Sequence, residues 1–387
     1  MLGKKKVYIE AQRLFRKQKH GMDVVALEIL QRLSTIDTEL ALTVVVKEDI
    51  DHCLEDSPSL SVQTLKPGFY PFWEQFTLPR FLEKADPGLL HCTGNTAPVW
   101  GKSPLLLTIH DLIFLEENYL FKKDGGSLYQ RFGNFYRSLV VPIVAKRAKY
   151  IITVSEFQRQ LIMRKLKVPA DKISVVYNGA DERFFERAEN DILNTILKKY
   201  NIDGFPYFFF LANTEPRKNT DGVIKAFSIF CKEYPQYNHH LVIKGLTDEI
   251  LEKKIIACHA ENLSSRIHRV GYIDYADLPG LYQGAAMLWF PSFTEGFGLP
   301  IVEAMAVGTP VITSNTSVMP EIAGDAALYV DPTQPEEIAH QTEKILSDQP
   351  LRESLIAKGK KNALRFSWTD SVNSLLSVYN KLLANHQ

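Results

Sequence analysis

Short apolar runs alternate with segments of helical periodicity along the chain, and this pattern occurs twice. Runs of this length, bounded by polar residues, are typical of strands buried on both faces of a parallel sheet. They lie at residues 42–46, 105–109, 150–154 and 174–177 in the first half, and at 207–211, 241–243, 267–270, 287–290, 310–313 and 327–330 in the second. The repeated alternation of strand and helix predicts an α/β fold with two doubly wound sheets.

A polar, charged segment from about Asp181 to Pro206 separates the two sets of predicted strands. We therefore expect an N-terminal domain over residues 1–180 and a C-terminal domain over residues 181–369. The last segment, about 370–387, carries an apolar stripe at helical spacing, and the periodicity leaves open whether this helix packs back on the first domain. Two doubly wound domains that face each other form a cleft, and ligands bind beyond the carboxyl ends of their strands.

Length and composition fit an ordinary enzyme. The 387 residues suffice for two to three domains of roughly 150 residues each. Lys plus Arg (45) balances Asp plus Glu (45), so no overall basic field exists to hold nucleic acid. The four cysteines are scattered and have no zinc-site spacing, so we predict no metal site. No apolar stretch approaches the roughly 20 residues of a membrane span, and no signal peptide is evident, so we expect a cytoplasmic protein.

The N-terminus has a local excess of positive charge. Residues 1–20 contain seven Lys and Arg side chains and one acid, Glu10. Such a cluster could contact anionic lipid at the inner face of a membrane, as a peripheral interaction. A solvated strand edge explains the same residues, and both readings stay open.

The most informative segment, residues 291–310, has the pattern strand, glycine loop, helix, strand. Pro300 suits a first helical turn and Gly308 suits a C-terminal cap, which predicts a helix over residues 299–307. Gly296 and Gly298 leave backbone N–H groups unobstructed beside the positive end of that helix. This arrangement can hold a diphosphate without a metal ion.

Two acids frame this loop. Glu295 precedes the glycines and Glu303 lies early in the predicted helix. Carboxylates repel phosphates but accept strong hydrogen bonds from hydroxyl groups, so a sugar and a ribose are suitable partners. From these residues alone, a tight turn with two solvent-facing acids is an equally good interpretation.

At this point the sequence resembles a known family. The pair Glu295 and Glu303, followed by Gly-Thr-Pro-Val at 308–311, is similar to the signature of retaining glycosyltransferases of family 4. Further fragments follow in the family's order at residues 108–111, 176–179, 215–219 and 270–272. The resemblance covers most of the chain. It implies the GT-B fold, in which two Rossmann-like, doubly wound domains face a central cleft.

The resemblance also implies roles for individual residues. Glu295 would contact the hydroxyls of the donor sugar, and Glu303 the ribose of the nucleotide. Arg217 and Lys218 would contact the donor pyrophosphate and offset the charge on the leaving group. This basic pair is adjacent here, whereas the arginine often precedes the lysine by several residues in the family. His110 would lie beside the sugar at the reacting centre.

The donor site would include backbone from several loops. Gly21 is the candidate for close approach to the diphosphate, in place of the family's glycine-rich loop, and Gly271 and Tyr272 would lie near the base. The predicted catalytic residues are His110, Lys218 and Glu295. The predicted donor-binding residues are Gly21, Arg217, Lys218, Gly271, Tyr272, Glu295, Gly296, Phe297, Gly298, Leu299 and Glu303.

The resemblance implies a retaining, metal-independent hexosyltransferase without a cofactor. Its donor would be a nucleotide-diphosphate sugar, with mannose as the best guess because Glu-Pro-Arg-Lys-Asn at 215–219 resembles mannosyl-transferring members. Its acceptor would be a glycan or lipid-linked hydroxyl in polysaccharide biosynthesis, bound by N-terminal loops that include Phe69–Trp73. A nucleotide-sugar epimerase of related architecture and a non-catalytic nucleotide-sugar-binding protein remain alternatives.

Other nucleotide-binding and hydrolytic classes lack their fingerprints. Residues 94–103 end like a P-loop, but six residues separate the two glycines and Pro98 removes a backbone donor. No Gly-x-Gly-x-x-Gly follows the first strand and no Gly-x-Ser-x-Gly occurs, which argues against a nicotinamide dehydrogenase and an α/β-hydrolase.

Overall fold

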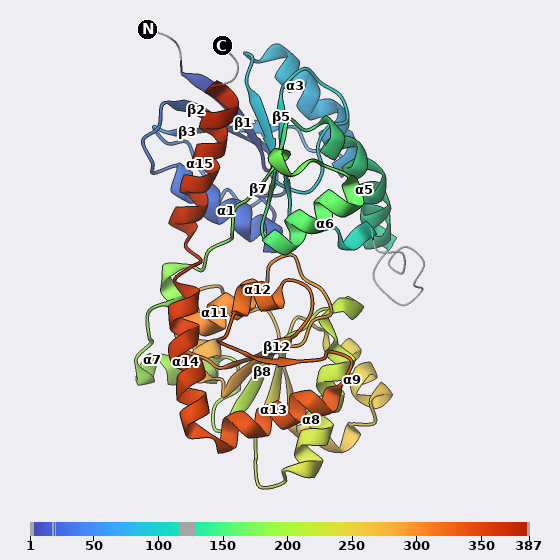
Figure 1. The fold of residues 1–387 in the computed structure, drawn as a ribbon, viewed down its shortest axis with the longest axis vertical. Helices are drawn as coiled ribbons and strands as arrows, with labels where there is room; N and C mark the ends of the chain where they lie inside the picture. Colours follow the sequence, from blue (N-terminus) through green and yellow to red (C-terminus); the bar gives the residue numbers. More distant parts are fainter. Residues whose placement is uncertain (1–3, 18, 20, 116–127, 385–387) are drawn as a thin grey trace. The chain divides into compact units, whose positions relative to one another are not determined.

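The computed structural model describes residues 4–17, 19, 21–115 and 128–384 (Figure 1). The chain divides into two compact units. Unit 1 contains the described residues up to Asn178 together with the C-terminal helix α15 (Trp368–Ala384). Unit 2 contains Gly179–Ser367. Each unit is an α/β layer structure around one parallel sheet, as the alternation of strands and helices predicted.

The sheet of unit 1 has seven strands, all parallel, in the order β3-β2-β1-β4-β5-β6-β7. The strands are β1 (Lys5–Glu10), β2 (Leu40–Lys47), β3 (Leu60–Leu65), β4 (Leu89–Cys92), β5 (Leu105–Ile109), β6 (Tyr150–Thr153) and β7 (Ile173–Val175). The sequence pattern predicted β2, β5, β6 and β7. It missed β3, an edge strand with several exposed polar residues, and β4, which has only four residues.

Helices and short turns connect these strands. They are α1 (Gly21–Leu33), α2 (Tyr70–Phe72), η1 (Trp73–Thr77), α3 (Leu78–Lys84), η2 (Ile113–Leu115), α5 (Leu128–Arg147), α6 (Glu156–Leu166) and η3 (Ala170–Lys172). The expectation that Phe69–Trp73 belongs to a loop was wrong, because α2, η1 and α3 form one helical run. Pro71 lies in the first turn of this run, where a missing N–H costs no hydrogen bond, and Pro79 lies where the π-helical turn η1 passes into α3.

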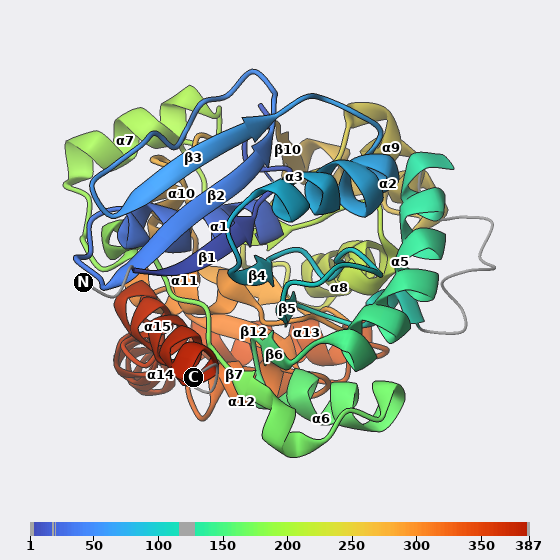
Figure 2. The ribbon, with the colours of Figure 1, turned by 90° about the horizontal axis from the view of Figure 1, so that it is seen from above.

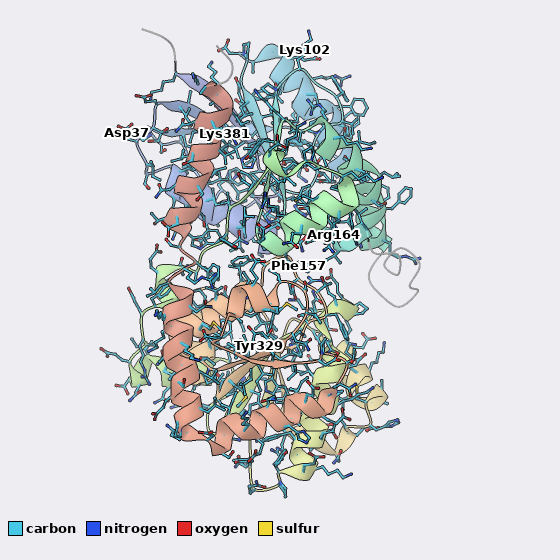
Figure 3. The ribbon with its side chains drawn as sticks, in the orientation of Figure 1. Asp37, Lys102, Phe157, Arg164, Tyr329 and Lys381 are labelled. Carbon is cyan, nitrogen blue, oxygen red and sulfur yellow. The ribbon has the colours of Figure 1, made fainter. Side chains whose placement is uncertain are left out.

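The C-terminal helix α15 packs on unit 1. Leu375 and Tyr379 share a hydrophobic core with Leu30 of α1. The Tyr379 hydroxyl lies 2.7 Å from Nδ1 of the buried His91, and Lys381, labelled in Figure 3, donates a hydrogen bond to the Tyr150 hydroxyl at 3.0 Å. These contacts answer the question that the helical periodicity left open.

The sheet of unit 2 has six parallel strands in the order β10-β9-β8-β11-β12-β13, and the sequence pattern predicted all of them. The strands are β8 (Tyr207–Leu211), β9 (His240–Lys244), β10 (Ile267–Val270), β11 (Met287–Phe290), β12 (Val311–Ser314) and β13 (Leu328–Val330). The helical elements are η4 (Glu182–Phe184), α7 (Asn190–Lys199), η5 (Pro216–Lys218), α8 (Thr220–Glu233), α9 (Asp248–Ala257), η6 (Glu261–Arg266), α10 (Leu278–Gly284), α11 (Leu299–Val307), α12 (Met319–Ala323), α13 (Pro335–Ser347) and α14 (Gln349–Ala363).

Candidate functional site

The predicted donor residues gather where the strand order of unit 2 reverses. From β8 the chain adds β9 and β10 on one side, and it then returns to add β11 and the later strands on the other. The loops after β8 and β11 therefore leave the carboxyl ends of two neighbouring strands in opposite directions. Open α/β sheets bind ligands at such a point. Here the Phe293 N–H donates a hydrogen bond to the Arg217 carbonyl oxygen at 2.8 Å, which joins the two loops.

A buried asparagine fixes the loop after β8. Asn219 adopts a left-handed conformation (φ 59°) between η5 and α8, a conformation that asparagine tolerates better than most residues. Its side-chain amide donates hydrogen bonds to the carbonyl oxygens of Pro291 (3.1 Å) and Pro332 (2.6 Å). A Cβ atom at Gly222 would lie 2.3 Å from the Asn219 side chain, so glycine is required there. This anchor sets the position of the preceding basic pair.

Arg217 and Lys218 both contact the carboxylate of Glu295. Arg217 Nη1 lies 2.5 Å from Glu295 Oε2, and Lys218 Nζ lies 2.6 Å from Oε1. Arg217 also pairs with Glu215. The side chains of this trio are only 10–18% exposed. The structure thus brings together three residues that the sequence analysis had assigned to one donor site.

Burial and charge act in opposite directions on Glu295. Burial by itself raises its pKa, but the charges of Lys218 and Arg217 outweigh burial and lower the pKa to about 2. Burial lowers the pKa of Lys218, while Glu295 partly compensates, and the Lys218 ammonium also lies 4.8 Å from the centre of the Phe290 ring. Glu295 is therefore an anion at any physiological pH. It holds the two cations in the positions where the phosphates of a ligand would compete for them.

The glycine loop leads directly into α11, whose bounds agree with the predicted helix at 299–307. Gly298 occupies the N-cap position with φ 101°, and Gly308 the C-cap position with φ 89°, both in the left-handed region that favours glycine. The first N–H groups of a helix have no partner within it, and the helix dipole favours an anion there. Gly298 and Leu299 therefore lie at the positive end of this helix, a few residues after Glu295, and Gly296 and Phe297 belong to the loop that leads into it.

Glu303 lies one turn into α11 and is buried. Its Oε2 accepts a hydrogen bond from the Tyr282 hydroxyl at 2.7 Å. Burial, together with the nearby Glu303 charge, raises the pKa of Tyr282 well above its ordinary value, so this tyrosine remains a donor. Tyr282 thereby fixes the orientation of the Glu303 carboxylate.

Two predicted donor residues lie farther along the sheet. Gly271 and Tyr272 follow β10, which β9 separates from β8. Tyr272 is 72% exposed. The structure therefore places them at the same end of the sheet as the basic pair but does not bring them to Glu295.

In unit 1, His110 follows β5 and is buried. Its Nε2 lies 2.8 Å from the Thr93 carbonyl oxygen, and since a carbonyl only accepts, this nitrogen carries the proton. Its backbone N–H donates to Asn95 Oδ1 at 2.7 Å. Burial lowers the pKa of His110, so the ring is neutral at neutral pH and keeps a lone pair on Nδ1. Such an imidazole accepts a hydrogen bond and carries no charge.

Gly21 is the first residue of α1. A Cβ atom at this position would meet no other atom within 4 Å, so packing inside the chain does not require a glycine. Open space at a helix start leaves room for a ligand.

Comparisons with known proteins agree with this arrangement. The family described as Glycosyltransferase Family 4 matches residues 13–184, and the family described as Glycosyl transferases group 1 matches residues 194–362. The chain belongs to the family 4 glycosyltransferases. The fold of Anabaena HepE, crystallised in complex with UDP, superposes with a TM-score of 0.71 at 17% identity over 97% of this chain and 100% of that chain. Both units together thus have the GT-B fold.

Two curated relatives of this family 4 chain are mannosyltransferases of Escherichia coli. O-antigen chain mannosyltransferase B is 35% identical over 61% of this chain and 61% of its own length. Serotype-specific mannosyltransferase WbdA is 28% identical over 72% of this chain and 33% of its own length. The chain therefore spans less than two thirds of either relative.

The sequence analysis missed a polar pocket in the N-terminal unit of this family 4 chain. It lies where the strand order of unit 1 reverses, between β1 and β4. Its lining includes Glu10, Gln12, Arg13, Asp23, Tyr70 and Thr93. The Gln12 side chain is buried, and its amide has no hydrogen-bond partner among the described residues. The available signal was limited to Glu10, Gln12 and Arg13 at the end of the first strand, without a recognisable motif.

Glu10 has an unusual electrostatic environment in this pocket. Its Oε1 accepts a hydrogen bond from the Gln12 backbone N–H at 2.8 Å. Burial, and secondarily the negative charge of Glu74, raises the pKa of Glu10 from its usual 4.5 to about 7. Glu74 itself is buried and accepts hydrogen bonds from Tyr136 (2.6 Å) and from the Gln75 side chain (2.9 Å).

Replacing Glu10 with glutamine should therefore stabilise the protein more at pH 8 than at pH 5. A carboxyl whose pKa is raised by folding contributes stability below its unfolded pKa and loses it as pH rises through the folded value, here between about 4.5 and 7. Glutamine escapes this loss, which for such a shift is roughly 3 kcal/mol. Urea unfolding of the wild type and the variant at pH 5 and pH 8 measures the change in the free energy of unfolding. The exposed Glu83→Gln is the control, and an equal effect of Glu10→Gln at pH 5 and pH 8 would contradict the assignment.

Metal ligands and membrane helices were also sought in the described residues. Over residues 4–17, 19, 21–115 and 128–384, no three His, Cys, Asp or Glu side chains are arranged to hold a metal ion. In the same part of the chain no helix has the length and apolar character needed to cross a bilayer.

Proposed function

We propose that this protein is a retaining hexosyltransferase that uses a nucleotide-diphosphate sugar. The favoured sugar is mannose, and the acceptor is a hydroxyl of a glycan or lipid-linked intermediate in polysaccharide synthesis. One observation carries the proposal: Arg217 and Lys218 converge on Glu295 at the reversal of the sheet, next to the N-terminus of α11. Two largely buried cations beside a helix N-terminus suit a diphosphate.

The donor diphosphate would bind Arg217, Lys218 and the N-terminus of α11. As the bond from the sugar to the diphosphate breaks, negative charge grows on the leaving phosphate, and the two cations stabilise it. The reaction then needs no metal ion, so a chelator such as EDTA should leave the rate unchanged. Glu295 would exchange part of its contact with the cations for a hydrogen bond from a sugar hydroxyl, and Glu303 would accept one from the ribose.

Retention requires the new bond to form on the face of the sugar that the diphosphate leaves. The acceptor oxygen bonds to the sugar carbon, and its proton passes to the departing phosphate oxygen, which completes the nucleoside diphosphate. Neutral His110 would lie beside the sugar and accept a hydrogen bond without adding a charge near the electron-poor carbon.

The comparisons support this substrate class. The E. coli relatives are named as mannosyltransferases, one of the O-antigen chain, and HepE was crystallised with UDP. For this protein we propose mannose as the sugar, a glycan or lipid-linked hydroxyl as the acceptor, and retention of configuration at the sugar carbon.

A thermal-shift panel tests the donor site. GDP, UDP, dTDP and ADP, each with and without an attached sugar, are added separately to the full chain. The nucleotide with the base that the site recognises should raise the melting temperature of the protein by several degrees. Lys218→Ala should reduce that shift, whereas Lys254→Ala, which removes a partly exposed lysine of the same unit, should keep it. If none of the nucleotides shifts the wild-type protein, the proposed donor site is wrong.

A further inference from the structure

Unit 1 exposes a set of large apolar side chains on two neighbouring helical segments. We call this set the aromatic face, and its members are 42–59% exposed. It consists of Phe69, Phe72, Phe76, Phe132, Phe135, Leu139 and Ile143. Single exposed apolar residues are ordinary, but a contiguous set on a soluble domain indicates an interaction surface.

On α5 the exposed residues form one stripe. Phe132, Phe135, Leu139 and Ile143 are separated by three, four and four positions, which places them on the same side of a helix. The other side packs into the core of unit 1 through Val141, Val144 and Ala145, which are at most 2% exposed. The helix is therefore apolar on two faces, and only one of them is covered within unit 1.

Specific contacts hold the second segment against α5. The Tyr136 hydroxyl of α5 donates a hydrogen bond to Glu74 of η1 at 2.6 Å, and Gln75 donates one to the same hydroxyl at 2.8 Å. The rings of Phe69 and Phe132 lie 5.5 Å apart. Figure 2 shows the α2 end of this helical run beside α5. The two halves of the aromatic face thus belong to one surface.

Most of the charged side chains around this surface are positive. The charged residues of α5 are Arg131, Arg137, Lys146 and Arg147, and the helix contains no acid. Lys146 is exposed and follows Ile143 by three positions, so it continues the apolar stripe. The α3 side adds Arg80, whose guanidinium lies 6.0 Å from the Phe76 ring, and Lys84 beside Glu83. An apolar stripe bordered by cations complements a membrane interface with anionic headgroups.

The basic N-terminus is a poorer candidate for such contact. Lys6 pairs with Asp86 and Lys19 with Asp51. Arg13 lies 3.2 Å from the buried Asp23. Several of the cations that the sequence analysis considered for lipid contact are thus engaged within the protein.

We propose that the aromatic face docks unit 1 on the surface of a lipid bilayer that contains anionic headgroups. The apolar side chains enter the interface, while Arg131 and Lys146 reach the headgroups. This surface would keep the protein at a membrane without a spanning helix. The proposal goes beyond the proposed function, because it requires neither a donor nor an acceptor.

Co-sedimentation of the full chain with vesicles tests the surface. The wild type should bind vesicles of phosphatidylcholine mixed with phosphatidylglycerol better than vesicles of phosphatidylcholine alone, and high salt should weaken binding. The double variant Phe135→Asp, Leu139→Asp should lower binding at least about tenfold, because burying one such side chain contributes a factor of ten or more. Lys146→Glu should weaken binding only to the anionic vesicles, by about fivefold or more.

Ile256→Asp on α9 is the matched control, since Ile256 is 52% exposed on a helix of unit 2 and should leave vesicle binding unchanged. The substituted positions are exposed, and melting curves of all variants verify that they fold. Absence of wild-type binding, or equal binding by the double variant, would overturn the proposal. So would a wild-type dimer in sedimentation velocity that the double variant dissociates while vesicles capture neither protein, because the face would then bind a second copy. None of these outcomes depends on nucleotide binding by unit 2.

Discussion

Replacing Lys218 with alanine is expected to lower the rate of sugar transfer at saturating donor by about 10²- to 10³-fold, the loss typical of removing one preorganised group that stabilises transition-state charge. The Lys218 side chain is only 13% exposed and its ammonium lies 2.6 Å from Glu295, so it requires little reorganisation when charge develops on the leaving phosphate. Steady-state kinetics with the donor identified by the thermal-shift panel give the rate. The loss should appear in kcat and not in KM alone.

Two variants separate this effect from a folding defect. In Lys218→Ala the Glu295 carboxylate keeps Arg217 as its partner, so the site retains a compensating charge. Lys254→Ala removes a partly exposed lysine paired with Asp221 in the same unit and should leave kcat unchanged. A Lys218→Ala protein that melts like the wild type and transfers sugar at the same rate would exclude Lys218 from the reaction.

The period of the apolar pattern explains which strands could be predicted. A strand buried on both faces, such as β8 with its run of Tyr, Phe and Leu, gives a continuous apolar signal. The edge strand β3 is largely exposed and reads as a loop, and β4 is too short to be distinguished from its surroundings. The strand order could not be read from periodicity at all, and the order is what places the loops after β8 and β11 side by side.

The candidate site could likewise be predicted only in part from the sequence. The resemblance pointed to Arg217, Lys218 and Glu295, and the structure shows that they share one carboxylate. The structure added the role of Asn219, whose amide anchors the loop through carbonyl groups more than 70 positions away in the chain. The pocket around Gln12 depends on the same kind of long-range proximity, because its members come from four separate segments of unit 1.

The aromatic face shows a different limit. Phe69–Trp73 has the composition of a recognition loop, but in the structure it leads into a helical run that buries Trp73 and Leu78. The exposed stripe on α5 has the same spacing as a buried stripe. Periodicity therefore finds an apolar face but does not say whether the protein covers it.

Replacing Glu295 with glutamine is expected to change the affinity for the nucleotide and the rate of transfer in opposite directions. The carboxylate competes with phosphates for Arg217 and Lys218, so its neutral isostere should bind a free nucleoside diphosphate at least about tenfold more tightly, a gain of 1.4 kcal/mol. The amide accepts a weaker hydrogen bond from the donor sugar, so transfer should fall by roughly 10- to 100-fold. Isothermal titration and steady-state kinetics measure the two effects.

Because the pKa of Glu295 is lowered to about 2, the effects of this substitution should not depend on pH near neutrality. The carboxylate is ionised throughout the range from pH 6 to pH 8, so both effects should be constant over that range. Glu215→Gln is the matched control, because Glu215 pairs with Arg217 but is not part of the contact with Lys218. That variant should retain transfer. If Glu295→Gln instead weakens nucleotide binding together with transfer, Glu295 acts only as a scaffold for the two cations, and its proposed contact with the sugar is wrong.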